Sequence, residues 1–181
     1  MIAYKFTRRG GRALFSAFQW PLPAHGRPGS WVEIEAPVRL GRHGLHGCEA
    51  HDLPYWLSDD LYEVELDSEL TAGPGAWVGL RARLLRPIET WTTAAAQRFG
   101  HEVAEQARAQ LMSSGAVESE LVASYLNEAL QRAAAGSHAV AAYAAALACA
   151  ATEAADRSRA QAAFARARAQ QGAALVALLG L

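Results

Sequence analysis

The side chains best suited to chemistry gather in one short segment, residues 42–52, which reads Arg-His-Gly-Leu-His-Gly-Cys-Glu-Ala-His-Asp. Zinc binds neutral imidazole and thiolate groups, so the nitrogen and sulfur donors of this segment could hold a metal ion. Those donors are His43, His46, Cys48 and His51. Their spacing matches no standard ligand pattern, and the sequence offers no second cluster to complete four-coordination. A metal-binding protein is therefore one alternative, although we expect no structural zinc site.

Two other interpretations of this segment remain open. His46 could serve as a general acid or base, or could position a substrate, because imidazole titrates near neutral pH. Cys48 could act as a nucleophile only with a low thiol pKa and a nearby base. Alternatively, His43 and His51 are exposed loop residues, while His46 and Cys48 pack inward beside Leu45.

The neighbours of His46 suggest a pocket. Gly44 and Gly47 flank it and would leave room for a ligand to approach the backbone. We expect this pocket between His46 and the strand that carries Tyr4, with aromatic walls and a guanidinium for an anionic group. The predicted catalytic residue is His46, and the predicted ligand-binding residues are Tyr4, Lys5, Arg42, Cys48, Tyr55 and Trp56.

The two halves of the chain differ in composition. All five Trp and all seven Pro lie in residues 1–91, whereas residues 92–181 are rich in Ala and contain no Pro. Aromatic residues favour strands and Ala favours helices. We predict an α+β protein, in which a small, mostly antiparallel β-rich module (1–91) carries the site and packs on a bundle of about four Ala-rich helices (92–181).

Residues 61–70 give the clearest strand signal, because Tyr62, Val64 and Leu66 alternate with acidic residues. A second alternating run, from Val78 to Leu84, includes Arg81 and Arg83. Antiparallel pairing would place these arginines beside the acidic residues, and we expect a solvated surface there rather than a substrate groove. Further elements are predicted as a strand at 2–6, a helical turn at 52–57 and helices that begin near residues 93, 117, 138 and 157.

Charge and cysteine content limit the class of protein. The formal net charge of −1 argues against a nucleic-acid binder, which needs a basic face. Cys48 and Cys149 cannot form a disulfide framework, and the first residues look like a strand rather than a secretory signal. The most apolar stretch, residues 139–152, is too short to span a bilayer. We therefore expect a cytoplasmic protein with reduced thiols and no membrane or nucleic-acid partner.

Residues 2–91 resemble an uncharacterised bacterial and phage family. Its members begin with a "YKF"-type strand, matched here by Tyr4-Lys5-Phe6, and share a core motif of Gly, an apolar residue, His, a small residue and Cys. Residues 44–48 match that motif. The helical tail is similar to the tails of actinobacterial members. This resemblance implies a shared fold and no defined activity.

Residues 44–66 are also similar, more distantly, to the middle of ADP-ribosyltransferase folds. Gly44-Leu45-His46, Tyr55 and residues 63–66 fill corresponding places, with His46 where an aromatic residue stacks on nicotinamide. The resemblance implies NAD as a cofactor, a first strand that binds it through Tyr4 and Lys5, and Glu89 as the nearest candidate for a catalytic carboxylate.

Three functions follow from these patterns. The first is a small enzyme or small-molecule-binding protein on an ADP-ribosyltransferase-like core, with a pocket around His46. The second is an adaptor that binds another protein through the helical bundle. The third is a metal-binding protein. The sequence specifies neither the substrate nor the oligomeric state.

Overall fold

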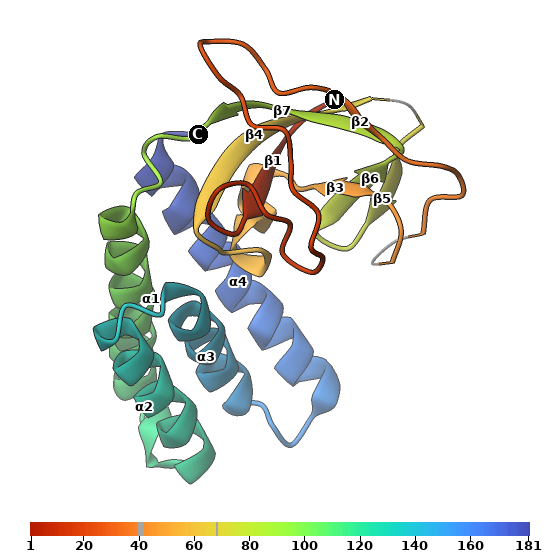
Figure 1. Ribbon diagram of the computed structural model, residues 1–181. Coiled ribbons are helices and arrows are strands. Elements are labelled where there is room, and N and C mark those ends of the chain that lie inside the picture. The colour runs from red at the N-terminus through yellow and green to blue at the C-terminus, as the bar shows by residue number, and fades with distance from the viewer. Residues whose placement is uncertain (40–41, 68) are drawn as a thin grey trace. The chain divides into compact units, whose positions relative to one another are not determined.

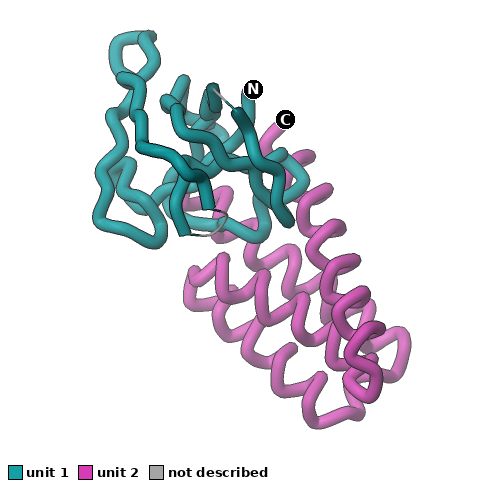
Figure 2. Tube along the Cα trace, turned by 90° about the vertical axis from the view of Figure 1, so that its right-hand side faces the viewer, with its two compact units in different colours: residues 1–92, 181 teal, residues 93–180 magenta. Residues whose placement is uncertain are grey.

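A computed structural model of the 181-residue chain describes residues 1–39, 42–67 and 69–181. The chain divides into two compact units, Met1–Thr92 with Leu181, and Thr93–Gly180 (Figure 2). The first unit holds antiparallel strands and the second holds α-helices (Figure 1), so the predicted α+β class is confirmed.

The first unit contains a four-stranded antiparallel sheet in the order β1-β4-β7-β2. Its strands are β1 (Ile2–Thr7), β2 (Val32–Glu33), β4 (Asp60–Asp67) and β7 (Arg81–Pro87). The alternation predicted for β4 is confirmed, because Val64 and Leu66 are fully buried while Glu65 between them is not. Together with Ala82 and Leu84 of β7, they form the centre of the core.

A second sheet has the order β3-β6-β5, formed by β3 (Leu45–Gly47), β5 (Thr71–Gly73) and β6 (Ala76–Gly79). The alternating run from Val78 to Leu84 is therefore not one strand. The chain bends at Leu80, whose carbonyl accepts a hydrogen bond from Ile34 N (2.9 Å). This bend lets Val78 and Ala82, both fully buried, belong to different sheets.

One backbone bridge connects β1 with the segment that follows β3. Tyr4 N donates to Cys48 O and Cys48 N donates to Tyr4 O, each over 2.8 Å. The 3₁₀ helix η1 (Ala50–Tyr55) begins two residues later and corresponds to the predicted helical turn. The bridge places the His46 segment directly beside Lys5.

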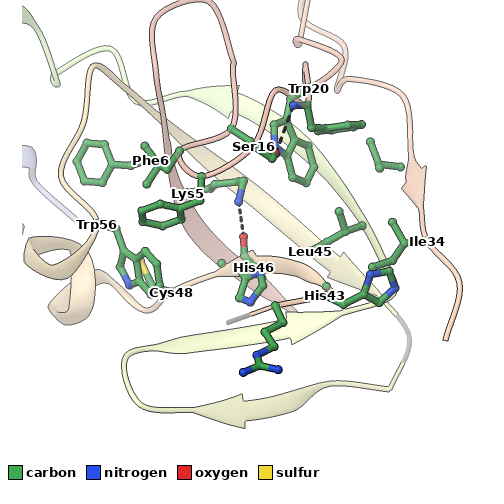
Figure 3. Close-up of a pocket in the computed structure, with 18 of the residues that line it drawn as sticks. Lys5, Phe6, Ser16, Trp20, Ile34, His43, Leu45, His46, Cys48 and Trp56 are labelled. Atoms are coloured by element: carbon green, nitrogen blue, oxygen red, sulfur yellow. Dashed lines mark hydrogen bonds between the residues drawn. The ribbon is translucent and has the colours of Figure 1, made fainter. Parts of the chain in front are cut away.

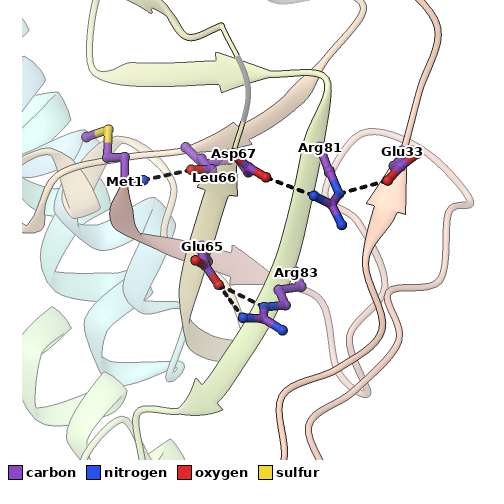
Figure 4. Close-up of polar contacts among 7 residues, drawn as sticks. All are labelled: Met1, Glu33, Glu65, Leu66, Asp67, Arg81 and Arg83. Carbon is purple, nitrogen blue, oxygen red and sulfur yellow. Dashed lines mark hydrogen bonds and ion pairs between the residues drawn. The ribbon is translucent and has the colours of Figure 1, made fainter.

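Ion pairs cover the outer face of the four-stranded sheet, as the sequence pattern predicted (Figure 4). Arg81 pairs with Asp67 (2.9 Å) and with Glu33 (2.7 Å), and Arg83 pairs with Glu65 (2.7 Å). The Trp31 ring lies 4.1 and 4.4 Å from the two guanidinium carbons. None of these described residues lines the cavity discussed below.

The second unit consists of α1 (Thr93–Ser113), α2 (Glu120–Ala134), α3 (His138–Ala151) and α4 (Arg157–Leu179), with the short 3₁₀ helix η2 (Ala116–Glu118) between α1 and α2. These bounds agree with the helices predicted to begin near residues 93, 138 and 157, whereas α2 begins at Glu120 and the start predicted near residue 117 lies in η2. The Asp156 side chain caps α4 by accepting hydrogen bonds from Ser158 N and Arg159 N. Buried alanines form much of the core, which allows close helix approach. None of the helices in the described ranges has the length and apolarity that crossing a membrane requires.

Candidate functional site

A cavity of about 500 Å³ lies within the first unit. Its lining comes from β1, from the loop that follows β1, from residues 42–48, and from Val32, Ile34 and Trp56. Figure 3 shows Lys5 extending from β1 toward β3, with Trp20 and Trp56 among the surrounding side chains. The cavity therefore forms where the sequence analysis expected a pocket, between His46 and the first strand.

Aromatic side chains form much of the cavity wall. The Phe15 ring lies 6.3 Å from the Trp56 ring, and the Phe18 ring lies 5.5 Å from the Trp20 ring, both edge to face. Trp20 is buried, whereas Phe15 is 86% exposed. Phe15, Phe18 and Trp20 were not predicted as site residues, although the apolar run 14–20 beside a Pro-rich segment was a usable signal.

Lys5, the only lysine of the chain, places its ammonium group in this cavity. Nζ donates a hydrogen bond to the carbonyl oxygen of His46 (2.8 Å) and lies 4.9 Å from the centre of the Trp20 ring. Burial of the ammonium group lowers the pKa of Lys5 to about 8, and the nearby Cys48 opposes this shift only in part. Among the described residues, no carboxylate pairs with Lys5.

The ring of His46 is half-buried. Burial lowers its pKa, the positive charge of Lys5 lowers it further, and a hydrogen bond with the Gly44 backbone opposes both effects. The ring is consequently neutral at pH 7 and can accept a proton rather than supply one. The catalytic role predicted for His46 stays a prediction. The group of His46 that contacts Lys5 is its backbone carbonyl and not its ring.

Cys48 lines the cavity, but its side chain is only 2% exposed. Burial raises the pKa of its thiol to about 12, with a further contribution from Asp52. A thiol that stays protonated at neutral pH is a poor nucleophile. The structure thus favours the packing role that was one of the alternatives for Cys48.

The remaining predicted residues fall in several places. Tyr4, Arg42 and Trp56 line the cavity, with Arg42 at an exposed position. Trp56 Nε1 donates a hydrogen bond to Gly75 O (2.8 Å), which fixes its ring. Tyr55 and Glu89 are not among the lining residues.

The candidate metal donors do not gather at one point. His43 Nε2 lies 2.7 Å from the carbonyl oxygen of Glu35, and His51 is exposed beside Glu49 (3.6 Å) and Asp52 (3.5 Å). Within residues 1–39, 42–67 and 69–181, no three His, Cys, Asp or Glu side chains form a group that could hold a metal ion.

The glycines beside His46 line the cavity, and each of them also makes room for a neighbouring core side chain. A Cβ at Gly44 would lie 2.0 Å from Val78 Cγ2, and its φ of 150° is one that L side chains rarely adopt. A Cβ at Gly47 would lie 3.0 Å from Val64 Cγ1. Both glycines therefore allow β3 to pack closely on the core.

The charged side chains in the described lining of the cavity are all cationic. The lining carries the cations Lys5 and Arg42 and the neutral imidazole of His46, and the described lining residues include no Asp or Glu. Cationic groups among aromatic walls can bind an anion and exclude a cation.

Comparisons of the chain with protein-family models, with curated proteins and with solved structures give no match.

Proposed function

We propose that the first unit is a small-molecule-binding protein whose cavity takes an anionic ligand with an apolar body. The observation that carries this proposal is the Lys5 ammonium, which lies among aromatic side chains with no carboxylate partner in the described part of the chain. A partly buried charge without a counter-ion is costly, and a bound anion would reduce that cost.

The size and lining of the cavity support the same class of ligand. A volume of about 500 Å³ lies in the range typical of sites for drug-sized molecules. Phe15 and Phe18 offer aromatic surface, which stacks favourably on flat apolar groups. Arg42 adds a second cation at an exposed position, so a ligand with two anionic groups is also compatible.

NAD, which the ADP-ribosyltransferase resemblance implies, is one molecule of this class because it carries a pyrophosphate and flat rings. Glycosyl transfer would require a carboxylate near the reacting carbon, and Glu89 lies outside the lining. The lining thus favours binding over ADP-ribosyl transfer.

Calorimetric titration tests the proposal with matched ligands. We expect 2-naphthoate to bind at least about tenfold more tightly than the neutral 2-naphthamide, since the two differ mainly in charge. Lys5→Met should remove that preference, whereas Arg166→Gln, at an exposed position of α4 in the other unit, should leave it unchanged. NAD is tested in the same series. Equal binding of acid and amide, or binding of neither, would contradict the proposal.

A further inference from the structure

Lys5 has the surroundings of a lysine that reacts as an amine. An ammonium group must lose its proton before its nitrogen can attack a carbonyl carbon, and burial among apolar groups promotes that loss. Lys5 lies beside the Trp20 ring and donates its hydrogen bond to a neutral carbonyl oxygen rather than to a carboxylate. Neither contact favours the ammonium form over the neutral amine as strongly as a carboxylate partner would.

We propose that the Nζ amine of Lys5 forms a reversible imine with an aldehyde or ketone group of the ligand. This inference rests on the proposed function, because it needs the cavity to admit a small anionic molecule. It adds the chemical class of that molecule, a carbonyl compound that also carries an anionic group.

The reaction balances without any further reactant. Lys5 first releases a proton to solvent, and the nitrogen lone pair then attacks the carbonyl carbon to form a C–N bond. The nitrogen gives up its two remaining protons, and the carbonyl oxygen takes up two protons, by way of solvent, and leaves as water while the C=N bond forms. One amine and one carbonyl group thus give one imine and one water, and hydrolysis restores both.

The proton equilibrium of Lys5 supports this chemistry. With a pKa of about 8 instead of 10.5, the neutral amine at pH 7.5 is more abundant by a factor on the order of a hundred. The α-amino group of Met1, which donates a hydrogen bond to Leu66 O (2.8 Å), is the other primary amine of the described chain and serves as an internal reference.

Reductive trapping tests the proposal, with 6-formyl-2-naphthoate as the probe and cyanoborohydride as the trap. We expect one adduct per folded chain, located on Lys5 at least about tenfold more often than on Met1. Trypsin cleaves after unmodified lysine, so the adduct should yield the uncut peptide 1–8, and fragmentation should place the added mass on Lys5. Protein unfolded in urea should lose the preference for Lys5.

Lys5→Arg is the matched variant, because it keeps the positive charge and removes the reactive amine. We expect it to give only the slow adduct at Met1. An adduct yield equal to that of the wild type would overturn the imine. If 2-naphthoate binds through Lys5 but the aldehyde gives no Lys5 adduct, the imine is wrong and the proposed function stands. If neither 2-naphthoate nor the aldehyde binds, the imine and the proposed function are both wrong.

Discussion

The Lys5 ammonium donates its 2.8 Å hydrogen bond to the backbone carbonyl of His46, not to the His46 ring. Pairing of Tyr4 with Cys48 holds that carbonyl beside β1, so the contact depends on strand register rather than on the side chain at position 46. Because the contact uses the backbone carbonyl, the role of Lys5 is separate from that of the His46 side chain, although the sequence placed both residues in one site.

Substitution of His46 tests this separation. His46→Ala keeps the backbone carbonyl, so we expect affinity for 2-naphthoate to fall by less than about threefold, against a loss of tenfold or more for Lys5→Met. Calorimetry on both variants makes the comparison, and urea unfolding confirms that each is folded. An equal or larger loss in His46→Ala would show that the imidazole itself holds the ligand.

The pKa of Lys5 predicts a specific pH dependence of stability. Between pH 8 and 10.5 the unfolded chain keeps the Lys5 proton and the folded chain has lost it, so the free energy of unfolding rises with pH. Relative to Lys5→Met, the wild type should gain about 1–3 kcal/mol across this window. The raised pKa of Cys48 acts in the opposite direction above pH 9, but it is present in both proteins.

Urea unfolding at several pH values from 7 to 10 measures this difference. The Lys5→Met variant should be at least as stable as the wild type at pH 7, because it replaces a partly buried charge with an apolar chain of similar length. A free-energy difference that stays constant with pH would contradict the lowered pKa.

Thiol reactivity tests the buried state of Cys48. In a Cys149→Ser variant, whose single thiol is Cys48, Ellman's reagent at pH 8 should label the native protein at least about a hundredfold more slowly than the urea-unfolded protein. Rapid stoichiometric labelling of the folded variant would restore Cys48 as a candidate nucleophile.

Substitution of Phe15 tests whether the loop that follows β1 contributes to ligand binding. Because Phe15 is 86% exposed, Phe15→Ala should change the free energy of unfolding by no more than about 0.5 kcal/mol. It should nonetheless weaken binding of 2-naphthoate several-fold, because the ring lines the cavity. Met112→Ala, which removes another exposed apolar side chain (60%) in α1, should change neither quantity.

Local sequence patterns predicted much of the fold. Alternation along β4 and the helix boundaries near Gly136 and Asp156 depend on neighbouring residues, and the structure agrees with them. The bend at Leu80 could not be predicted from local patterns. It arises because β6, before Leu80, and β7, after it, belong to different sheets.

The site was predictable only in outline. The segment 42–48 was identified from its residue types, and it does line the cavity. Residue types alone point to His46 and to the two glycines, because the chemistry of these residues is visible in the sequence. The charge environment of Lys5 depends on contacts with Trp20 and with a distant carbonyl, 15 and 41 positions along the chain, which no local pattern encodes.

NMR of protein labelled with [ε-¹³C]lysine tests the central claim most directly, because a chain with one lysine gives one side-chain signal. We predict that this signal titrates with a pKa near 8 in the free protein and that 2-naphthoate raises this pKa, since a bound anion stabilises the ammonium form. A pKa near 10.5 that 2-naphthoate leaves unchanged would contradict the account of Lys5 as a partly buried cation that binds an anion.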